Sequence, residues 1–424
     1  MLIGKVKQKL SSQFVRNIGW LWIAELVNRI FRLGTTVTLA RMFSPQDYGL
    51  MAIVYTVYEF AIVFTLRGGI GAKIVQAEEK DVKTICDTSY WLNWILCISV
   101  FVVQCLAAFP VAYFYGNQQL VLPICTLALV YLMYPFFLVQ SAMIERENRL
   151  KIRALGSAIQ SFVNNLITVV LALLGMGLWS IVWAMVLSTP ILIIINQINY
   201  SWQPPKSFKL EQWQQVSSFG TNMLGVELLN KLRFNMDYLI VGKFLSIEQL
   251  GIYYFAFNAG VGITSNIVYA FMSALYPHIC AVKDDYQQLK KRYFSSLKSL
   301  SIFVVIIVSL QTFLAPFYVP IIFGEKWVKA TPVLMIICVS VIPLSFRWAS
   351  STLFKAIDKT HLMLYFDVIY TAIFGIALIA AVKWGVLWVA ITVLVTHSLM
   401  SLAFNIWAVK CVFSKDKFFA FSKS

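Results

Sequence analysis

Long apolar runs dominate this chain and constrain its fold more than any other feature. A run of about 20 apolar residues can cross a bilayer as a helix. Twelve such runs occur along the 424 residues, at approximately 17–40, 44–66, 88–114, 119–142, 155–174, 178–200, 213–242, 249–275, 297–322, 331–354, 362–382 and 384–409. Because 59% of the residues are hydrophobic and only 13% are charged, an ordinary soluble domain is excluded. The sequence therefore predicts an all-α membrane protein.

Lysine and arginine indicate the orientation, because cytoplasmic loops of membrane proteins carry an excess of both residues. If the N-terminus is inside, the outside loops hold few of the 35 basic residues, namely Arg41, Lys243, Lys326, Lys329 and Lys383. Most of the others fall in cytoplasmic segments at 67–83, 146–153 and 283–298 and near the ends of the chain. We therefore expect both termini in the cytoplasm. The net charge of +16 is mostly this bias at the inner surface, where anionic lipid headgroups attract basic residues. A nucleic-acid partner is therefore not needed to explain the charge.

The two halves of the chain repeat one another in order. The residues Glu-Asn-Arg at 25, 28 and 29 recur 202 positions later as Glu-Asn-Lys at 227, 230 and 231. Further pairs are Gly49 with Gly251, Gly116 with Gly324, Pro135 with Pro343, and Asn148 with Asp358. Six runs separate the copies, so the halves run parallel. We predict two six-helix lobes around a central polar cavity, residues 1–204 and 205–424, joined by the proline-containing segment 202–206.

The first run carries a polar stripe. Glu25, Asn28, Arg29 and Arg32 are spaced so that they share one face of a helix. An ionised side chain at the centre of a membrane helix costs roughly 2.5–3.5 kcal/mol, so such residues usually have a function. Either Glu25 pairs with Arg29 and holds helices together, or the stripe lines a substrate cavity. We predict Asn28, Arg29 and Arg32 as substrate-binding residues and Glu25 as an ion-coupling residue, since arginine matches phosphate oxygens.

The seventh run carries a second polar face, whose charges balance. Its members are Glu227, Asn230, Lys231, Arg233, Asn235 and Asp237. On burial Lys231 can lose a proton and Glu227 can gain one, so this pair is either a proton- or sodium-linked switch or an inert ion pair. We predict Asn230, Lys231 and Arg233 as substrate-binding residues, and Glu227 and Asp237 as ion-coupling residues.

Three ionisable residues lie in other runs. Glu59 follows Tyr55 by one helical turn and either contacts that hydroxyl or pairs with an arginine of the first run. Arg347 is deep in the tenth run and either lines the cavity or acts as a packing partner. We predict Glu59 as ion-coupling and Arg347 as substrate-binding. Asp367 lies near the cytoplasmic end of its run, where it could reach the interface, and we leave it out of the predicted site.

Enzymatic and metal chemistry find little support in the sequence. The glycine-rich segment 67–73 lacks the Lys-Ser/Thr that follows a phosphate loop, and we expect it to be a tight cytoplasmic turn. His278, His361 and His397 stand far apart, and the seven cysteines form no CxxC pair. We expect no metal, no enzyme activity and no cofactor, apart from a coupling H⁺ or Na⁺.

Several segments together resemble one family. The sequence LARMFSPQDYG at 39–49 is similar to the first outside loop of bacterial polysaccharide flippases of the multidrug/oligosaccharidyl-lipid/polysaccharide exporter superfamily. The sequence DYLIVGKFL at 237–245, followed by LGIY at 250–253, is similar to their seventh helix and next loop. FGEKW at 323–327 is similar to their connection between the ninth and tenth helices. The resemblance covers nearly the whole chain.

This resemblance implies twelve transmembrane helices and alternating access driven by a cation gradient. It also implies an undecaprenyl-diphosphate-linked oligosaccharide (an isoprenoid-diphosphate-linked glycan) as substrate, flipped from the inner to the outer leaflet of the bacterial inner membrane. A polysaccharide polymerase and a chain-length regulator would be partners. In this reading the basic residues bind the diphosphate, while Asn28, Asn230 and Asn235 meet sugar hydroxyls.

Two alternatives remain open. A drug or cation exporter of the same superfamily would favour an acidic cavity, whereas the basic residues inside the runs slightly outnumber the acidic ones. A membrane glycosyltransferase or polymerase would need acidic catalytic residues outside, where the short loops hold only Asp47, Glu248 and Glu325.

Overall fold

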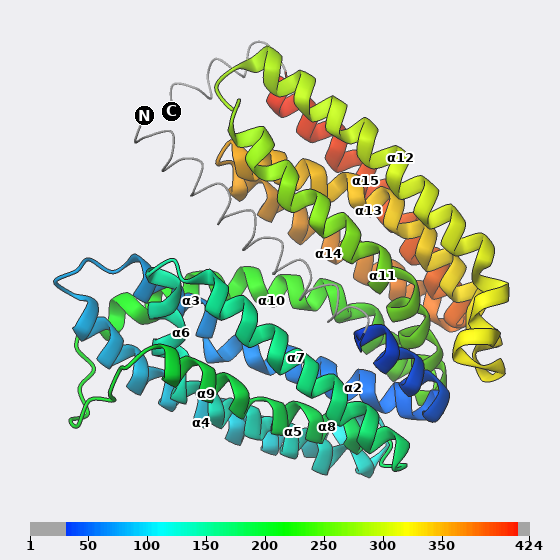
Figure 1. Ribbon diagram of the computed structural model, residues 1–424. Coiled ribbons are helices and arrows are strands. Elements are labelled where there is room, and N and C mark those ends of the chain that lie inside the picture. Colours follow the sequence, from blue (N-terminus) through cyan, green and yellow to red (C-terminus); the bar gives the residue numbers. More distant parts are fainter. Residues whose placement is uncertain (1–30, 414–424) are drawn as a thin grey trace, which may run out of the picture. The chain divides into compact units, whose positions relative to one another are not determined.

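A computed structural model describes residues 31–413, apart from the side chains at 222, 223, 263, 266 and 361. Every regular element in this range is helical (Figure 1). Residues 31–42 are helical, and the α-helices that follow are α2 (Pro45–Ala61), α3 (Arg67–Gln76), α4 (Val82–Phe114), α5 (Val121–Met133), α6 (Leu138–Arg146), α7 (Leu150–Leu173), α8 (Leu178–Ser188), α9 (Pro190–Asn199), α10 (Trp213–Phe244), α11 (Ile247–Cys280), α12 (Tyr286–Tyr318), α13 (Thr331–Ala356), α14 (Thr360–Ala381) and α15 (Val386–Phe413). Short turns of other helix types connect them, namely η1 (Ile62–Thr65), η2 (Gln118–Leu120), η3 (Tyr134–Phe136), η4 (Val319–Phe323), η5 (Glu325–Ala330) and η6 (Val382–Trp384).

Most of these helices could cross a membrane. Within residues 31–413, nine spans are long and apolar enough, and α11, which is bent by 44° between Ile247–Gly262 and Ile267–Cys280, brings the number to ten. The two expected runs outside this set are 17–40, most of which lies outside the described residues, and 213–242. The latter lies in α10, whose 32 residues would suffice in length but carry several charges after Glu227. The chain is a multi-pass membrane protein, and the figure of twelve spans stays a prediction.

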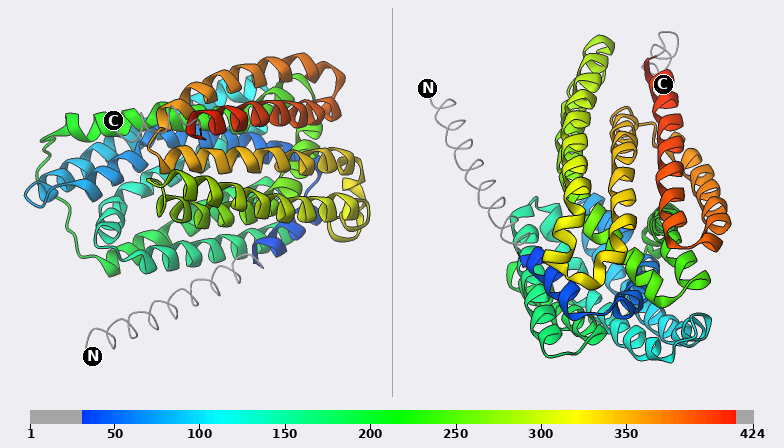
Figure 2. Two further views of the ribbon diagram at one scale, coloured as in Figure 1. Left: turned by 90° about the horizontal axis from the view of Figure 1, so that it is seen from above. Right: turned by 90° about the vertical axis from the view of Figure 1, so that its right-hand side faces the viewer.

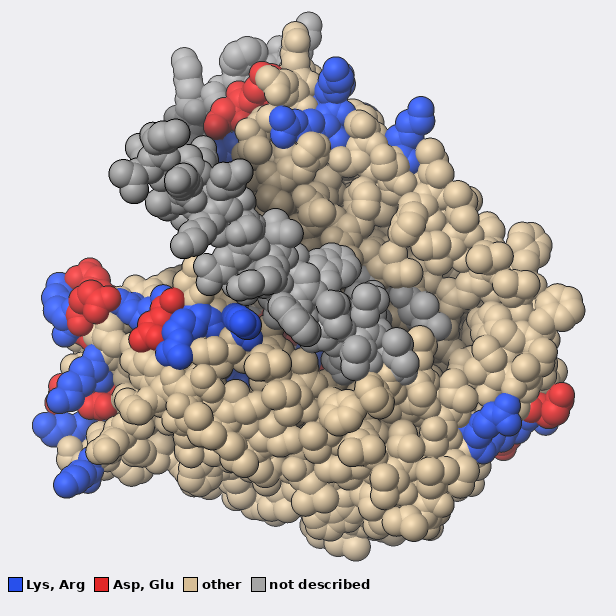
Figure 3. Space-filling model, viewed as in Figure 1, with Lys and Arg blue, Asp and Glu red and all other residues tan. Residues whose placement is uncertain are grey.

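The distribution of charge agrees with insertion in a bilayer. On the face drawn in Figure 3, Lys, Arg, Asp and Glu lie near the ends of helices, and the helix flanks between them carry other side chains. Many large apolar side chains of the helices are exposed, among them Phe109, Phe313 and Ile376. Such surfaces are stable against lipid chains, which are as apolar as the side chains themselves.

The internal repeat is visible in the backbone. Three pairs of residues with positive φ recur at matching places: Gly116 (64°) with Gly324 (107°), Asn148 (56°) with Asp358 (58°), and Gly177 (51°) with Gly385 (99°). Positive φ favours glycine and is tolerated by Asn and Asp, so these residue types recur because the same turns recur. The two halves of the chain therefore share one backbone plan, as the sequence pairs predict.

The chain forms two compact units. Unit 1 contains Val54–Leu228 with residues 31–43, and unit 2 contains Ser44–Ile53 with residues 229–413. We predicted a boundary at 204/205, in the segment 202–206. The two compact units divide inside α2 and inside α10, and the lobe boundary at 204/205 stays a prediction.

In unit 1, α3, α4 and α6 share a core with the first turns of α10. The expected tight turn at 67–73 is wrong, because Leu66 adopts a left-handed conformation (φ 49°) and the chain then continues as α3. Glycine serves here for close packing: a Cβ added at Gly69 would lie 2.5 Å from the Cα atom of Gly220 in α10. This contact is one reason why the first half of α10 belongs to unit 1.

Unit 2 is built around α13, which packs against α11, α12 and α15. Figure 2 shows α13 between α12 and α15. The first turns of α2 join this unit through a reciprocal contact. A Cβ at Gly49 would lie 2.0 Å from the carbonyl oxygen of Ile247, and a Cβ at Gly251 would lie 1.7 Å from that of Pro45. Since these residues are two repeat pairs, the starts of α2 and α11 contact each other symmetrically.

Candidate functional site

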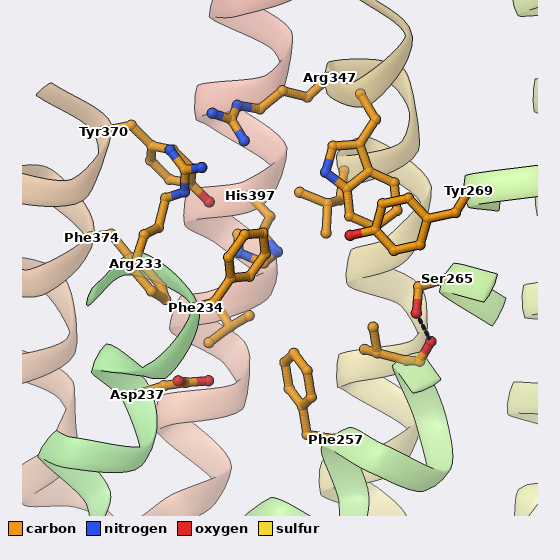
Figure 4. A pocket seen from close by; sticks show the side chains of 14 residues that line it. Arg233, Phe234, Asp237, Phe257, Ser265, Tyr269, Arg347, Tyr370, Phe374 and His397 are labelled. Atoms are coloured by element: carbon orange, nitrogen blue, oxygen red, sulfur yellow. Dashed lines mark hydrogen bonds between the residues drawn. The ribbon is translucent and has the colours of Figure 1, made fainter. Parts of the chain in front are cut away.

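Unit 2 contains a cavity of about 150 Å³ among five helices (Figure 4). It is lined by Arg233, Phe234 and Asp237 of α10, Phe257, Val261, Ser265 and Tyr269 of α11, Leu344, Arg347 and Trp348 of α13, Tyr370 and Phe374 of α14, and Val393 and His397 of α15. In Figure 4 both guanidinium groups lie near Tyr370, while Asp237 lies toward the other end of the cavity. Two arginines in an apolar chamber are the feature that requires explanation.

One carboxylate binds both arginines. The Arg233 Nη1 atom lies 2.9 Å from Oδ1 of Asp367, and Nη2 of Arg347 donates to the same oxygen. The exposed fractions of the three side chains are 7%, 4% and 15% for Arg233, Arg347 and Asp367. The cluster is therefore buried and carries one net positive charge. A buried ion pair is costly to desolvate, so retaining it points to a role other than stability alone.

The rest of the arginine surface meets aromatic rings and one amide. The Arg347 guanidinium lies 4.9 Å from the ring centre of Tyr370, and that of Arg233 lies 5.7 Å from the same ring. Arg233 also donates from Nη2 to the side-chain oxygen of Asn230, at 2.8 Å. The Nε atoms of both arginines are buried without a hydrogen-bond partner among the described residues. The cluster thus holds donor capacity that no described protein group uses.

Asp237 has one hydrogen-bond partner on another helix and one in its own helix. Its Oδ2 atom accepts a hydrogen bond from the Tyr253 hydroxyl at 2.7 Å, and its Oδ1 atom accepts one from the backbone N–H of Tyr238 at 3.0 Å. Asp237 lines the cavity, and together with Asp367 its formal charge balances those of the two arginines.

The sequence of α10 explains this arrangement. Asn230, Arg233 and Asp237 follow one another at spacings of three and four residues, which places them on one face of the helix. That face meets α14 and α11, which supply Asp367 and Tyr253. Arg347 approaches from α13. Each charged group is thereby bound to a group of another helix.

The comparisons with known proteins identify the family. Residues 38–332 match a family described as "Polysaccharide biosynthesis protein". The chain belongs to this family. Teichuronic acid biosynthesis protein TuaB of Bacillus subtilis is 24% identical over 95% of this chain and 83% of its own length. Lipopolysaccharide biosynthesis protein WzxC of Escherichia coli is 23% identical over 86% of this chain and 74% of its own length.

A further relative and two solved structures agree with this. Succinoglycan biosynthesis transport protein ExoT of Rhizobium meliloti is 24% identical over 77% of this chain and 65% of its own length. An inward-facing multidrug resistance MATE family transporter of the MOP superfamily has a TM-score of 0.76 at 13% identity, over 94% of this chain and 96% of that one. Lipid II flippase MurJ, in an inward closed conformation, has a TM-score of 0.75 at 11% identity, over 95% and 90%. The likeness to these structures concerns the fold.

The resemblance to polysaccharide flippases of this superfamily is thereby confirmed. Among these proteins ExoT is named as a transport protein, and the two solved structures are a transporter and a flippase. What remains for the site is to place the predicted residues.

Three of the predicted residues line or border the cavity directly: Arg233, Arg347 and Asp237, with Asn230 bound to Arg233. Other predicted residues lie elsewhere. Glu25, Asn28 and Arg29 lie outside the described residues. Arg32 is exposed, and Glu59, Glu227 and Lys231 are half-buried at positions that do not line this cavity. Asn235 is buried and donates to the backbone oxygen of Lys231, at 3.0 Å. The roles of all these residues stay predictions.

Two residues at this cavity were not predicted. Asp367, which we left out as an interfacial side chain, bridges the two arginines instead. His397 lines the cavity with its Nδ1 atom buried and without a hydrogen-bond partner in the described part of the chain. The excess of arginine over carboxylate in the tenth run is the signal that could have indicated a partner such as Asp367. Among the described residues no group of three His, Cys, Asp or Glu could hold a metal ion.

Proposed function

We propose that this protein flips an isoprenoid-diphosphate-linked oligosaccharide, such as an undecaprenyl-diphosphate glycan, from the inner to the outer leaflet of the bacterial inner membrane. Membership of a polysaccharide biosynthesis family supports transport of a glycan intermediate. The observation that carries the proposal is the pair of buried arginines that share one carboxylate. Both termini would lie in the cytoplasm, and a polymerase and a chain-length regulator would act on the product.

The arginine pair suits a phosphate group. A guanidinium presents parallel N–H donors that match phosphate oxygens, and it stays charged when buried. Arg233 and Arg347 approach one point from two helices, so two guanidinium groups can bind one diphosphate. The cavity of about 150 Å³ is small, so the oligosaccharide needs space elsewhere in the protein. Arg29, Arg32 and Lys231 remain proposed contributors from the other predicted positions.

Asp367 would compete with the substrate for the arginines. When the phosphate binds, the Asp367 carboxylate loses both positive partners and becomes available to bind a cation in their place. Release of the substrate reverses this exchange. Such competition would couple transport to H⁺ or Na⁺, with Asp237 as a second carboxylate in the same chamber. Outward movement of a negative headgroup is favoured by about 2.3 kcal/mol per charge for each 100 mV of inside-negative potential.

The test is export of polymer by cells that depend on this protein. Arg233→Ala and Arg347→Ala should each lower export at least tenfold, while the protein reaches the membrane in normal amounts. Arg347→Lys should restore only part of the activity, because lysine keeps the charge but loses the forked geometry. Arg153→Ala is the matched control, since Arg153 is exposed and pairs with Glu145 at the surface, where ion pairs contribute little.

A reconstituted assay separates the alternatives. Vesicles that contain the purified protein should flip a polyprenyl-diphosphate glycan, and the double variant of Arg233 and Arg347 to alanine should not. Full export by that double variant would refute the arginine site. Transport of an organic cation, with no flipping of the lipid, would favour a drug or cation exporter.

A further inference from the structure

Unit 1 contains a second cavity, of about 270 Å³, which the predicted site does not include. Tyr55 of α2, Tyr134 of η3, Gln160 and Asn164 of α7, and Ser188 and Thr189 near the break between α8 and α9 contribute its polar wall. No residue that lines this cavity carries a charge at neutral pH. Its chemistry is thus hydroxyl, amide and aromatic ring.

The internal repeat relates this cavity to the one in unit 2. Tyr55 and Phe257 both line their cavities and are 202 positions apart, the same offset as Gly49 and Gly251. Asn164 and Phe374 are 210 positions apart, as are the positive-φ residues Asn148 and Asp358. Thr189 and His397 are 208 apart, as are Gly177 and Gly385. The two halves therefore build one cavity twice, each time in the same part of the fold.

The two copies differ in chemistry. At the repeat-related positions unit 2 has Phe374 and His397, and its cavity holds an arginine pair. Unit 1 has Asn164 and Thr189 there, an amide and a hydroxyl, which both donate and accept hydrogen bonds. A neutral polar wall cannot stabilise a phosphate or an organic cation as strongly as a charged one. It does match sugar hydroxyls, which also donate and accept.

Part of the hydrogen-bonding capacity of the wall is unused. Within the described residues the Gln160 amide and the Tyr55 hydroxyl make no hydrogen bond, and the only one to the Asn164 side chain is a long bond of 3.4 Å from Ser188. Tyr134, in contrast, is fixed: its hydroxyl lies 2.6 Å from that of Tyr58, and the Arg67 guanidinium lies 4.5 Å from its ring centre. Rigid rings beside unused amides are suited to a ligand that presents both C–H faces and hydroxyls.

We propose that this cavity is a carbohydrate subsite that binds an uncharged sugar residue of the transported glycan. The inference rests on the proposed function, because it assigns a sugar residue of the same substrate to this cavity. The repeat explains how the lining could arise: two copies of one cavity diverged in chemistry, one neutral and one charged. A volume of about 270 Å³ suits one or two sugar rings and not a longer chain.

The experiment compares two lipids on the full-length protein in nanodiscs. One is undecaprenyl diphosphate, and the other is the undecaprenyl-diphosphate glycan extracted from membranes of the host strain. The wild type should bind the glycan-bearing lipid at least tenfold more tightly, which is the size expected for one or two buried hydrogen-bonded groups. Gln160→Leu/Asn164→Leu keeps the approximate side-chain size but removes the amides. It should abolish this preference and leave affinity for undecaprenyl diphosphate unchanged.

Controls distinguish failure of this inference from failure of the proposed function. Thr168 lies on the same helix, and its hydroxyl donates only to the Asn164 backbone oxygen, at 2.7 Å. The variant Thr168→Val should therefore keep the preference for the glycan-bearing lipid. Arg347→Ala should lower the affinity for both lipids by the same factor. If the wild type binds neither lipid, the proposed function fails. If it binds both equally, or if the amide variant keeps the full preference while remaining folded, only the sugar subsite is refuted.

Discussion

Removal of Asp367 should destabilise unit 2, because this carboxylate is the shared partner of two buried guanidinium groups. At the 2.9 Å separation of Asp367 and Arg233, one ion pair is worth about 6 kcal/mol at an effective dielectric constant of about 20. Most of this attraction offsets desolvation, so the loss on breaking the cluster should be about 3–5 kcal/mol. We therefore expect Asp367→Asn to lower the free energy of unfolding by that amount.

The measurement is reversible unfolding of the purified protein in mixed micelles, followed by the loss of helical circular dichroism. Asp358→Asn is the matched control: it removes a carboxylate from the turn that precedes the same helix, where φ is 58° and the repeat-related residue is Asn148. It should change stability by less than about 0.5 kcal/mol. Adding Arg347→Gln to Asp367→Asn should restore part of the loss, since one unpaired charge is removed. A loss below about 1 kcal/mol, or strict additivity of the two changes, would refute this account of the cluster.

Two further stability predictions follow from close contacts in unit 2. Gly251→Ala places a Cβ 1.7 Å from the backbone oxygen of Pro45 and should lower the free energy of unfolding by about 1–3 kcal/mol. Gly34→Ala, whose Cβ would have nothing within 4 Å, should be neutral or slightly stabilising. Equal effects of the two substitutions would contradict the contact. Tyr253→Phe removes the hydroxyl that donates to Asp237 and should lower the free energy of unfolding by about 1–3 kcal/mol. An unchanged free energy of unfolding would show that another group donates a hydrogen bond to this carboxylate.

The sequence was most informative where a pattern is long. Within residues 31–413, nine of the expected spans are found, or ten with the bent α11, because about 20 apolar residues leave few alternatives to a membrane helix. The repeat pairs were also predictive, since Asn148 and Asp358 hold the same rare backbone conformation. The segment 67–73 was misread because three glycines indicate a turn as readily as close helix packing. Only the position of Gly220 on another helix distinguishes the two.

The site was harder to predict because charges pair between helices. Within α10, Arg233 and Asp237 are four residues apart and would be read as partners, yet Arg233 binds Asp367 and Asp237 binds Tyr253. Pairing across helices stabilises the bundle, while a pair within one helix leaves neighbouring helices unconnected. Position along a run was also misleading for Asp367, since depth in the sequence does not tell which neighbour a side chain faces.

The repeat resolves part of this difficulty, because it lets one half be interpreted through the other. No single residue of the cavity in unit 1 has an unusual chemistry, and neither Gln160 nor Asn164 would be selected from sequence alone. Their significance follows from the offset that aligns them with the wall of a charged cavity. A duplicated transporter gains two equivalent chambers, and one can change its lining while the other keeps its function. Thr189→Val and His397→Val change repeat-related positions of the two chambers. If each variant weakened binding of phosphate and of sugar to the same extent, separate roles for the two chambers would be refuted.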